Sequence, residues 1–264
     1  MSFTGGDTIK LKLVRDGKAY YFFVNDTLVL YNENGFKDAQ GVVGMFSFNT
    51  VLTASKYHVT TGAAADSQIA DAKAAAALLT KLSLTCNWFA DQGDGKFTLT
   101  TNSNAEHMVD DLTRGGQVLR AKYYSVKGKL TLANAGDWGQ ARILVSADAK
   151  NEYFIALEKT NTGKYQIFTM SKANQTGWDA WELILHQDTN GTRNSIDFEI
   201  LVIGNKLYFL IEDQVVYTST RVPMTESTVK FTGYNTATTT VENLSAEVFA
   251  SKQEAEAYLA DKSI

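Results

Sequence analysis

The chain has 264 residues, 44% of them hydrophobic, and a formal net charge of −4 from 25 basic and 29 acidic side chains. This length fits one large domain or two small ones. The small negative charge gives no electrostatic basis for binding nucleic acid, and no apolar run approaches the roughly 20 residues of a transmembrane helix. We therefore expect no nucleic-acid partner and no membrane insertion.

The residue types favour pleated sheets. Proline occurs once, whereas tyrosine and phenylalanine number 12 and 14, and aromatic residues are enriched in strands. The one cysteine, Cys86, excludes an intramolecular disulfide. No basic cluster or helix start flanks it, so we expect a packed, unreactive thiol. The first residues lack the apolar core of a signal peptide.

Along the chain, alternation and turn residues predict about five strands within residues 8–60. They lie at about 8–15, 18–24, 27–31, 41–48 and 51–60. Alanine-rich sequence follows, with apolar residues at helical spacing, and predicts a helix at 67–82 within a linker of residues 63–84.

Residues 85–250 return to strand patterns. About a dozen short strands, separated by turn residues, are typical of a sandwich rather than of alternating strands and helices. The last segment, 251–264, is predicted to be helical. Ser251 is followed three residues later by Glu254, which is the pattern of a capping box.

Two segments of the chain resemble each other. With a constant offset of 187 (204 − 17), Gly17 matches Gly204, and residues 21–22 match 208–209 as a Tyr-Phe pair. Asp26 matches Asp213 at the next turn. Glycine and an acid at turns and aromatics within a strand are structural requirements, so we expect both segments to share one backbone.

The strand-rich region before the predicted helix is much shorter than the one after it. Residues 9–60 match only about 196–248, so residues 1–62 are predicted to be a partial copy of the sandwich formed by 85–250. An incomplete sandwich leaves sheet edges and an apolar face uncovered. Residues 1–60 are therefore expected to pack on a second chain, by self-association, or on the complete domain of the same chain.

The later strand-rich part of the chain, within residues 85–250, resembles the concanavalin A-like lectin/glucanase superfamily, whose members include laminin-G-like jelly rolls. The resemblance rests on the following residues: 141–157, 163–165, 181–183, 196–202, 204–205, 215–216 and 231–239. It includes an Asp-x-x-Asn-x-Tyr pattern that splits a strand pair at residues 148–153. The resemblance covers about 96–250, and its later part recurs in 9–60.

This resemblance implies an all-β fold, an antiparallel β-sandwich jelly roll, here with a partial N-terminal copy and short helical linkers. Many relatives of this kind are non-catalytic sugar-binding or adhesive modules within multidomain bacterial surface proteins. The resemblance therefore also implies such a module, in a bacterial surface protein with tandem repeats. An extracellular or cell-surface location in a bacterium follows as an expectation.

Catalytic and metal sites are not indicated by the sequence. Glucanases of this fold carry Glu-x-Asp-x-Glu on one strand, and retention needs two carboxyl groups about 5 Å apart. The nearest approach is Asp197-x-Glu199, whose counterparts in the first segment are Lys10 and Lys12. The three histidines show no ligand spacing. We expect no enzyme activity, no metal and no cofactor.

Sugar binding requires exposed aromatic faces beside hydroxyl-binding polar groups. Trp138 and Trp178 lie in glycine-containing turns next to Asp137 and Asp179, and Asn190 lies in a third turn. These five residues are the predicted carbohydrate site, although each tryptophan could instead cover an end of the sandwich. Trp181 alternates with leucines, so it is expected in the core.

The sequence thus favours a non-catalytic carbohydrate-binding or adhesion module with a glycan or cell-surface polysaccharide as its partner. The first alternative is a structural spacer or assembly repeat without a ligand. A glycoside hydrolase, or its accessory domain, is the third.

Overall fold

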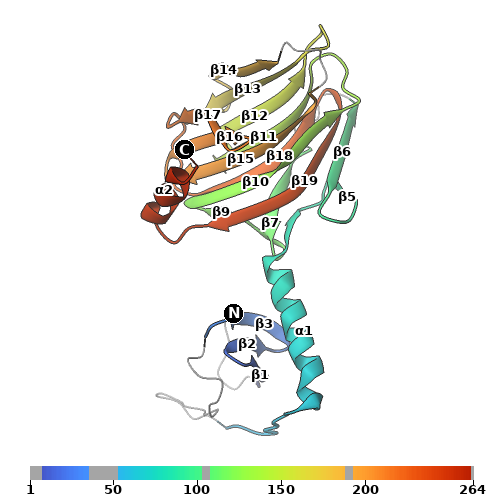
Figure 1. The fold of residues 1–264 in the computed structure, drawn as a ribbon, viewed down its shortest axis with the longest axis vertical. Coiled ribbons are helices and arrows are strands. Elements are labelled where there is room, and N and C mark those ends of the chain that lie inside the picture. The colour runs from blue at the N-terminus through green and yellow to red at the C-terminus, as the bar shows by residue number, and fades with distance from the viewer. Residues whose placement is uncertain (1–7, 36–52, 103–107, 188–192, 263–264) are drawn as a thin grey trace. The chain divides into compact units, whose positions relative to one another are not determined.

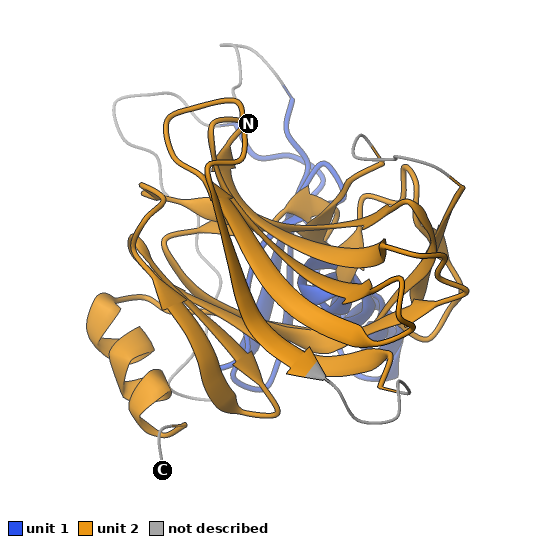
Figure 2. Ribbon diagram, turned by 90° about the horizontal axis from the view of Figure 1, so that it is seen from above, with its two compact units in different colours: residues 1–81 blue, residues 82–264 orange. Residues whose placement is uncertain are grey.

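The computed structural model describes residues 8–35, 53–102, 108–187 and 193–262. The chain divides into two compact units, Met1–Lys81 and Leu82–Ile264, which have different colours in Figure 2. In these described ranges, no helix is both long and apolar enough to cross a membrane.

The first unit is a small antiparallel sheet with a helix on one face. Its elements are β1 (Leu11–Asp16), β2 (Ala19–Val24), β3 (Thr27–Asn32) and α1 (Ala63–Thr80) (Figure 1). Ala72 and Ala76 of the helix pack with Val14, Tyr21 and Phe23 of the sheet. The predicted helix is confirmed, and it is part of this core rather than a free linker.

The second unit is a two-layer sandwich. Its strands are β4 (Leu82–Leu84), β5 (Ala90–Asp91), β6 (Phe97–Asn102), β7 (Asp110–Arg114), β8 (Gln117–Val118), β9 (Arg120–Ala121), β10 (Tyr123–Ala133), β11 (Gly139–Asp148), β12 (Asn151–Lys159), β13 (Tyr165–Lys172), β14 (Ala180–Gln187), β15 (Ser195–Ile203), β16 (Lys206–Ile211), β17 (Gln214–Ser219), β18 (Ser227–Tyr234) and β19 (Thr236–Val248).

These strands form two antiparallel sheets (Figure 1). The seven-stranded sheet has the order β17-β16-β15-β10-β19-β6-β5. The nine-stranded sheet has the order β14-β13-β12-β11-β18-β7-β4, with β8 paired to β7 and β9 paired to β18. The predicted antiparallel β-sandwich is confirmed, although residues 82–84, which the sequence assigns to the linker, form its strand β4.

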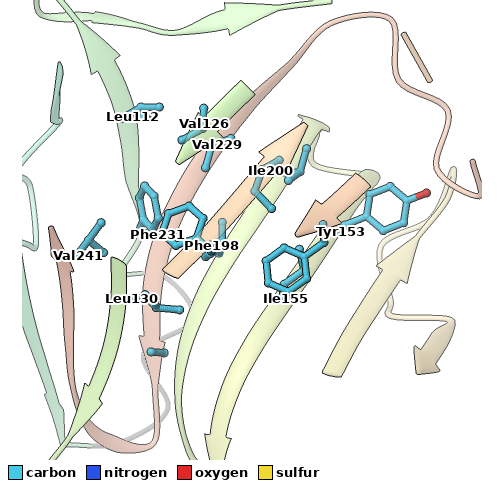
Figure 3. Packing of buried hydrophobic residues seen from close by; sticks show 14 of the residues in the cluster. Leu112, Val126, Leu130, Tyr153, Ile155, Phe198, Ile200, Val229, Phe231 and Val241 are labelled. Atoms are coloured by element: carbon cyan, nitrogen blue, oxygen red, sulfur yellow. The ribbon is translucent and has the colours of Figure 1, made fainter. Parts of the chain in front are cut away.

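The inner faces of the two sheets form one apolar core, part of which Figure 3 shows. Tyr153 and Ile155 of β12 are buried there, together with Phe198 of β15 in the facing sheet and Phe231 of β18 in the same sheet. The Tyr153 hydroxyl donates a hydrogen bond to Ser219 Oγ at 2.8 Å. The core thus accepts a phenol because its polar end has a partner.

The two segments that resemble each other in sequence have the same backbone. Strands β1, β2 and β3 correspond to 198–203, 206–211 and 214–219 with the same offset of 187 (204 − 17). The bulge between Phe22 and Phe23 recurs between Phe209 and Leu210. The turn glycines Gly17 and Gly204 have φ of 57° and 64°. The shared backbone predicted for these strands is therefore confirmed.

A C-terminal helix, α2 (Lys252–Ala260), covers the outer face of the seven-stranded sheet. Its Ala255 packs with Leu201 and Leu210. The predicted N-cap is confirmed, since the backbone N–H of Glu254 donates to Ser251 Oγ at 3.2 Å. In the first unit, α1 covers the corresponding face of β1–β3.

Lys262 fixes the end of this helix to the sheet. Its ammonium lies 3.1 Å from the buried carboxylate of Glu199 and also pairs with Asp213. The hydrogen bond and the positive charge of Lys262 lower the pKa of Asp213. The link to Asp213 is therefore present at neutral pH and is lost as the pH falls through this lowered pKa.

Three expectations about local structure need correction or remain untested. The strand predicted at 41–48 lies outside the described residues, and residues 53–60 form no strand. Cys86 is exposed rather than packed. Its φ is 56°, a left-handed turn conformation, so the chain leaves strand geometry two residues after the end of β4 and the side chain is not packed between the sheets.

Asp110 is the polar anchor of the segment that enters the sandwich. It lies within β7 and is fully buried. Its carboxylate accepts hydrogen bonds from Thr85 Oγ1 at 2.6 Å and from the backbone N–H groups of Asn87, Trp88 and Phe89 at 2.7–2.9 Å. Four donors compensate the burial of this charge.

We expect Asp110→Asn to lower the free energy of unfolding of the second unit by about 3 kcal/mol, because an amide cannot accept all four bonds and leaves buried donors unpaired. Urea unfolding followed by tryptophan fluorescence measures this, since all four tryptophans lie in the second unit. Asp111→Asn is the control, with an expected change within about 0.5 kcal/mol. Equal effects of the two substitutions would contradict the assignment.

Candidate functional site

The outer face of the nine-stranded sheet carries the candidate site. Along β11, Ala141, Ile143 and Val145 are fully buried in the core, so the alternating residues Gln140 and Arg142 point to the outer face. The strand register aligns the outward-facing residues of β18, β11, β12, β13 and β14 in rows across the sheet.

The centre of this face is the guanidinium of Arg142. It lies 4.6 Å from the ring centroid of Phe154 on β12 and 4.0 Å from that of Tyr234 on β18. Its Nε donates a hydrogen bond to Gln140 Oε1 at 2.6 Å. Although it is on an outer face, Arg142 is only 6% exposed. Two aromatic rings and an amide therefore hold this cation in one orientation.

A row of polar side chains begins next to the arginine. Gln140 Nε2 donates to one carboxylate oxygen of Glu158, and Gln166 Nε2 donates to the other at 2.5 Å. Glu158 is 5% exposed. The row joins β11, β12 and β13 at one level of the sheet, so its amides and carboxylate are fixed before any ligand arrives.

Aromatic side chains continue the face toward the edge strand. The Phe154 ring meets Trp178 edge to face at 4.6 Å, and the Phe168 ring lies 5.9 Å from Trp181 of β14. Lys172 Nζ lies 4.8 Å from the Trp178 ring. We call the set Arg142, Phe154, Phe168, Trp178, Trp181 and Tyr234 the aromatic face.

The structure brings part of the predicted site to this face. Trp178 belongs to it and is half-buried. Asp179 follows at its margin, and its carboxylate pairs with Arg221 at 2.7 Å. Asn190 lies outside the described residues.

The other two predicted residues lie at the opposite end of the strands. Trp138 and Asp137 precede β11, whereas Trp178 follows β13 beside the far end of β11. Ten residues of β11 separate these ends, which corresponds to about 30 Å. Asp137 and Trp138 are both exposed, and Trp138 has a φ of 63°. Trp138 and Trp178 therefore cannot stack on the same sugar ring.

The expectation that Trp181 lies in the core is wrong. Trp181 is 56% exposed. Trp181 does alternate with apolar residues along β14. However, β14 is an edge strand, and Trp181 lies on its outer face next to Phe168. A bulge opposite Ile167 and Phe168 then places Leu185 and Leu183 on different faces.

Two buried glutamates share the outer face of β12, but they are far apart. Glu152 is held by Lys172 at 2.7 Å and by Ser146 Oγ at 2.7 Å. Glu158 lies six residues further along the strand, about 20 Å away. This exceeds the 5–9.5 Å that separates the carboxyl groups of most glycosidases.

No group of three or more potential metal ligands occurs in the part of the chain that the structure describes. A cleft near Tyr165, Leu185 and Arg193 encloses about 10 Å³. That is room for one water and not for a sugar ring. The aromatic face does not line this cleft: its Trp181 is exposed, Trp178 and Tyr234 are half-buried, and Arg142, Phe154 and Phe168 are buried beneath them.

Sequence reasoning missed Arg142, Gln140, Glu158 and Tyr234. A signal was present in β11, where Gln140 and Arg142 alternate with apolar residues. It predicts a polar outer face, but it could not show that the rings of Phe154 and Tyr234 enclose the arginine.

No family model and no curated protein match this chain. Among solved structures, it is similar to the carbohydrate binding module CBM66 from Bacillus subtilis, with 14% identity over 64% of this chain and 96% of that chain, and a TM-score of 0.43. It is similar to a Bacillus licheniformis beta-glucanase, with 12% identity, coverage of 62% and 83%, and a TM-score of 0.45.

A third similar structure is the PL7 alginate lyase AlyA1 from Zobellia galactanivorans, with 10% identity, coverage of 61% and 81%, and a TM-score of 0.41. Likenesses at these identities and scores assign no function to the chain. The function must therefore be argued from its own aromatic face.

We expect Arg142→Ala to destabilise the second unit by about 3 kcal/mol, because it leaves two rings and Gln140 without their partner. Arg142→Lys keeps the charge but not the planar group, and about 1 kcal/mol should be lost. Urea unfolding followed by tryptophan fluorescence tests both. The control is Arg221→Ala, which removes an exposed ion pair and should lower the free energy of unfolding by less than about 1 kcal/mol. An equal loss in Arg221→Ala and Arg142→Ala would contradict the central role of Arg142.

Proposed function

We propose that the second unit is a non-catalytic carbohydrate-binding module whose glycan lies across the aromatic face, between Tyr234 and Trp181. The observation that carries this proposal is the immobilised Arg142. Its guanidinium is fixed between two rings beside the row of Gln140, Glu158 and Gln166.

The chemistry of a sugar matches such a surface. A pyranose has an apolar C–H face that stacks on an aromatic ring and hydroxyl groups that need donors and acceptors at its rim. Trp181 offers an exposed ring, and Tyr234 is half-exposed. Because the polar groups are held in place, binding would cost little side-chain entropy.

The carboxylates support binding rather than hydrolysis. Glu158 has amide partners on both oxygens, and Glu152 forms an ion pair with Lys172. Their separation is unsuited to the paired-carboxylate mechanism. The proposal therefore includes no catalytic step. It also includes an extracellular or cell-surface location in a bacterium, where such a module would meet polysaccharide.

A second candidate is a spacer or assembly repeat with no ligand. The observation in its favour is that β1–β3 with α1 repeats the arrangement of β15–β17 with α2. A spacer role requires no fixed polar row on an outer face, so glycan binding separates the two candidates.

We expect the full chain to bind at least one polysaccharide on an array of immobilised glycans. Trp181→Ala should weaken binding about tenfold, because it removes one stacking platform worth roughly 1.4 kcal/mol. Trp138→Ala is the matched control, since Trp138 is similarly exposed but lies at the other end of the strands, and it should leave binding unchanged.

Two outcomes would count against this proposal. Loss of binding in Trp138→Ala alone would move the site to the opposite end of the strands. A correctly folded chain that binds no glycan would favour the spacer role.

A further inference from the structure

The three-stranded sheet of the first unit has an open edge at β1. Its order is β1-β2-β3, and within the described residues no strand pairs with the other side of β1. The corresponding strand β15 is not an edge, because it pairs with β10 in an antiparallel register from Tyr123 to Thr131. An open edge offers backbone donors and acceptors to an added strand.

Within the described residues, the face of this sheet opposite α1 is covered only in part: Val24 is buried there, whereas three leucines are exposed. Leu11, Leu13 and Leu30 are 60%, 40% and 52% exposed. With the shared offset, Leu11 and Leu13 correspond to Phe198 and Ile200, which are buried in the sandwich core. The backbone that β10 and a facing sheet complete in the second unit therefore has no such strand beside β1 in the described part of the first unit.

The charges along the edge differ between the two copies. In the second unit, Glu199 of β15 lies opposite Lys127 of β10, at 3.7 Å, and Asp197 lies opposite Lys129. In the first unit, Lys12 and Lys10 occupy the positions of Glu199 and Asp197. A strand with the sequence of β10 would therefore place lysine opposite lysine, which is unfavourable across paired strands.

We propose that β1 binds an antiparallel polypeptide strand from outside the described chain, with carboxylates opposite Lys10 and Lys12 and apolar side chains on its other face. This strand would have the pattern of β10, in which Val126 and Leu130 alternate with Lys127 and Lys129, but with the charge reversed. Pairing supplies affinity through the backbone, and the charge reversal excludes the chain's own β10.

The test uses two fluorescein-labelled peptides and the full chain. One peptide has the sequence of residues 122–133, and the other carries Lys127→Glu and Lys129→Glu in the same sequence. Fluorescence anisotropy measures the affinity of each. The acidic peptide should bind about tenfold more tightly, chiefly because the like-charge pair at Lys12 becomes an opposite-charge pair, since Lys10 already pairs with Asp26 at 2.8 Å. A salt concentration of 1 M should reduce the difference.

Matched controls locate the contact. A scrambled peptide with the composition of the acidic one should not bind, since it keeps the charge and loses the alternation. The chain variant Lys12→Glu should reduce or reverse the preference. Lys12→Gln removes the positive charge without adding a negative one. Its preference for the acidic peptide should lie between that of the original chain and that of Lys12→Glu. Hydrogen exchange should show new amide protection in residues 11–16 when the acidic peptide is bound.

The proposal fails if neither peptide binds, if both bind equally, or if the preference is unchanged in both Lys12 variants. Protection gained in the second unit instead of β1 would also overturn it. None of these results depends on glycan binding, so the two proposals fail independently.

Discussion

The arrangement of the second unit depends on keeping a guanidinium out of water on the outer side of a sheet. Desolvating a charge costs several kcal/mol unless its partners are in place. For Arg142 these partners are a ring from β18, a ring from β12 and an amide from its own strand. These groups come together only when β18, β11 and β12 have the observed register. The contacts of Arg142 therefore stabilise both the pairing of these strands and the positions of the side chains on the aromatic face.

The two outer faces of the sandwich are used differently. Helix α2 covers the seven-stranded sheet, whereas aromatic side chains and a fixed polar row occupy the nine-stranded sheet. The first unit repeats three strands of the former sheet with the same turns and bulge but with lysines in place of acids. A single backbone thus has a paired edge in one copy and, among the described residues, an unpaired edge in the other, and fold alone does not determine its partner.

The sequence predicted those features that local chemistry determines. Period-two alternation and turn residues indicated the sandwich, and the offset between the copies indicated their shared backbone. The same alternation could not tell whether Trp181 faces the core or solvent, because it defines a face without saying which side it occupies. Arg142 and Tyr234 are 92 residues apart (234 − 142), and only strand order brings them together. For the same reason, the sequence placed Trp138 and Trp178 in one site although β11 separates them.

The most direct measurement of the central claim is protein-observed NMR during titration with a glycan that the full chain binds, following the four tryptophan indole N–H signals and the Nε–H signal of Arg142. Our account predicts shifts for Trp178, Trp181 and Arg142, while Trp88 and Trp138 remain unchanged. Shifts confined to Trp138 or Trp88, with Arg142 unaffected, would contradict it.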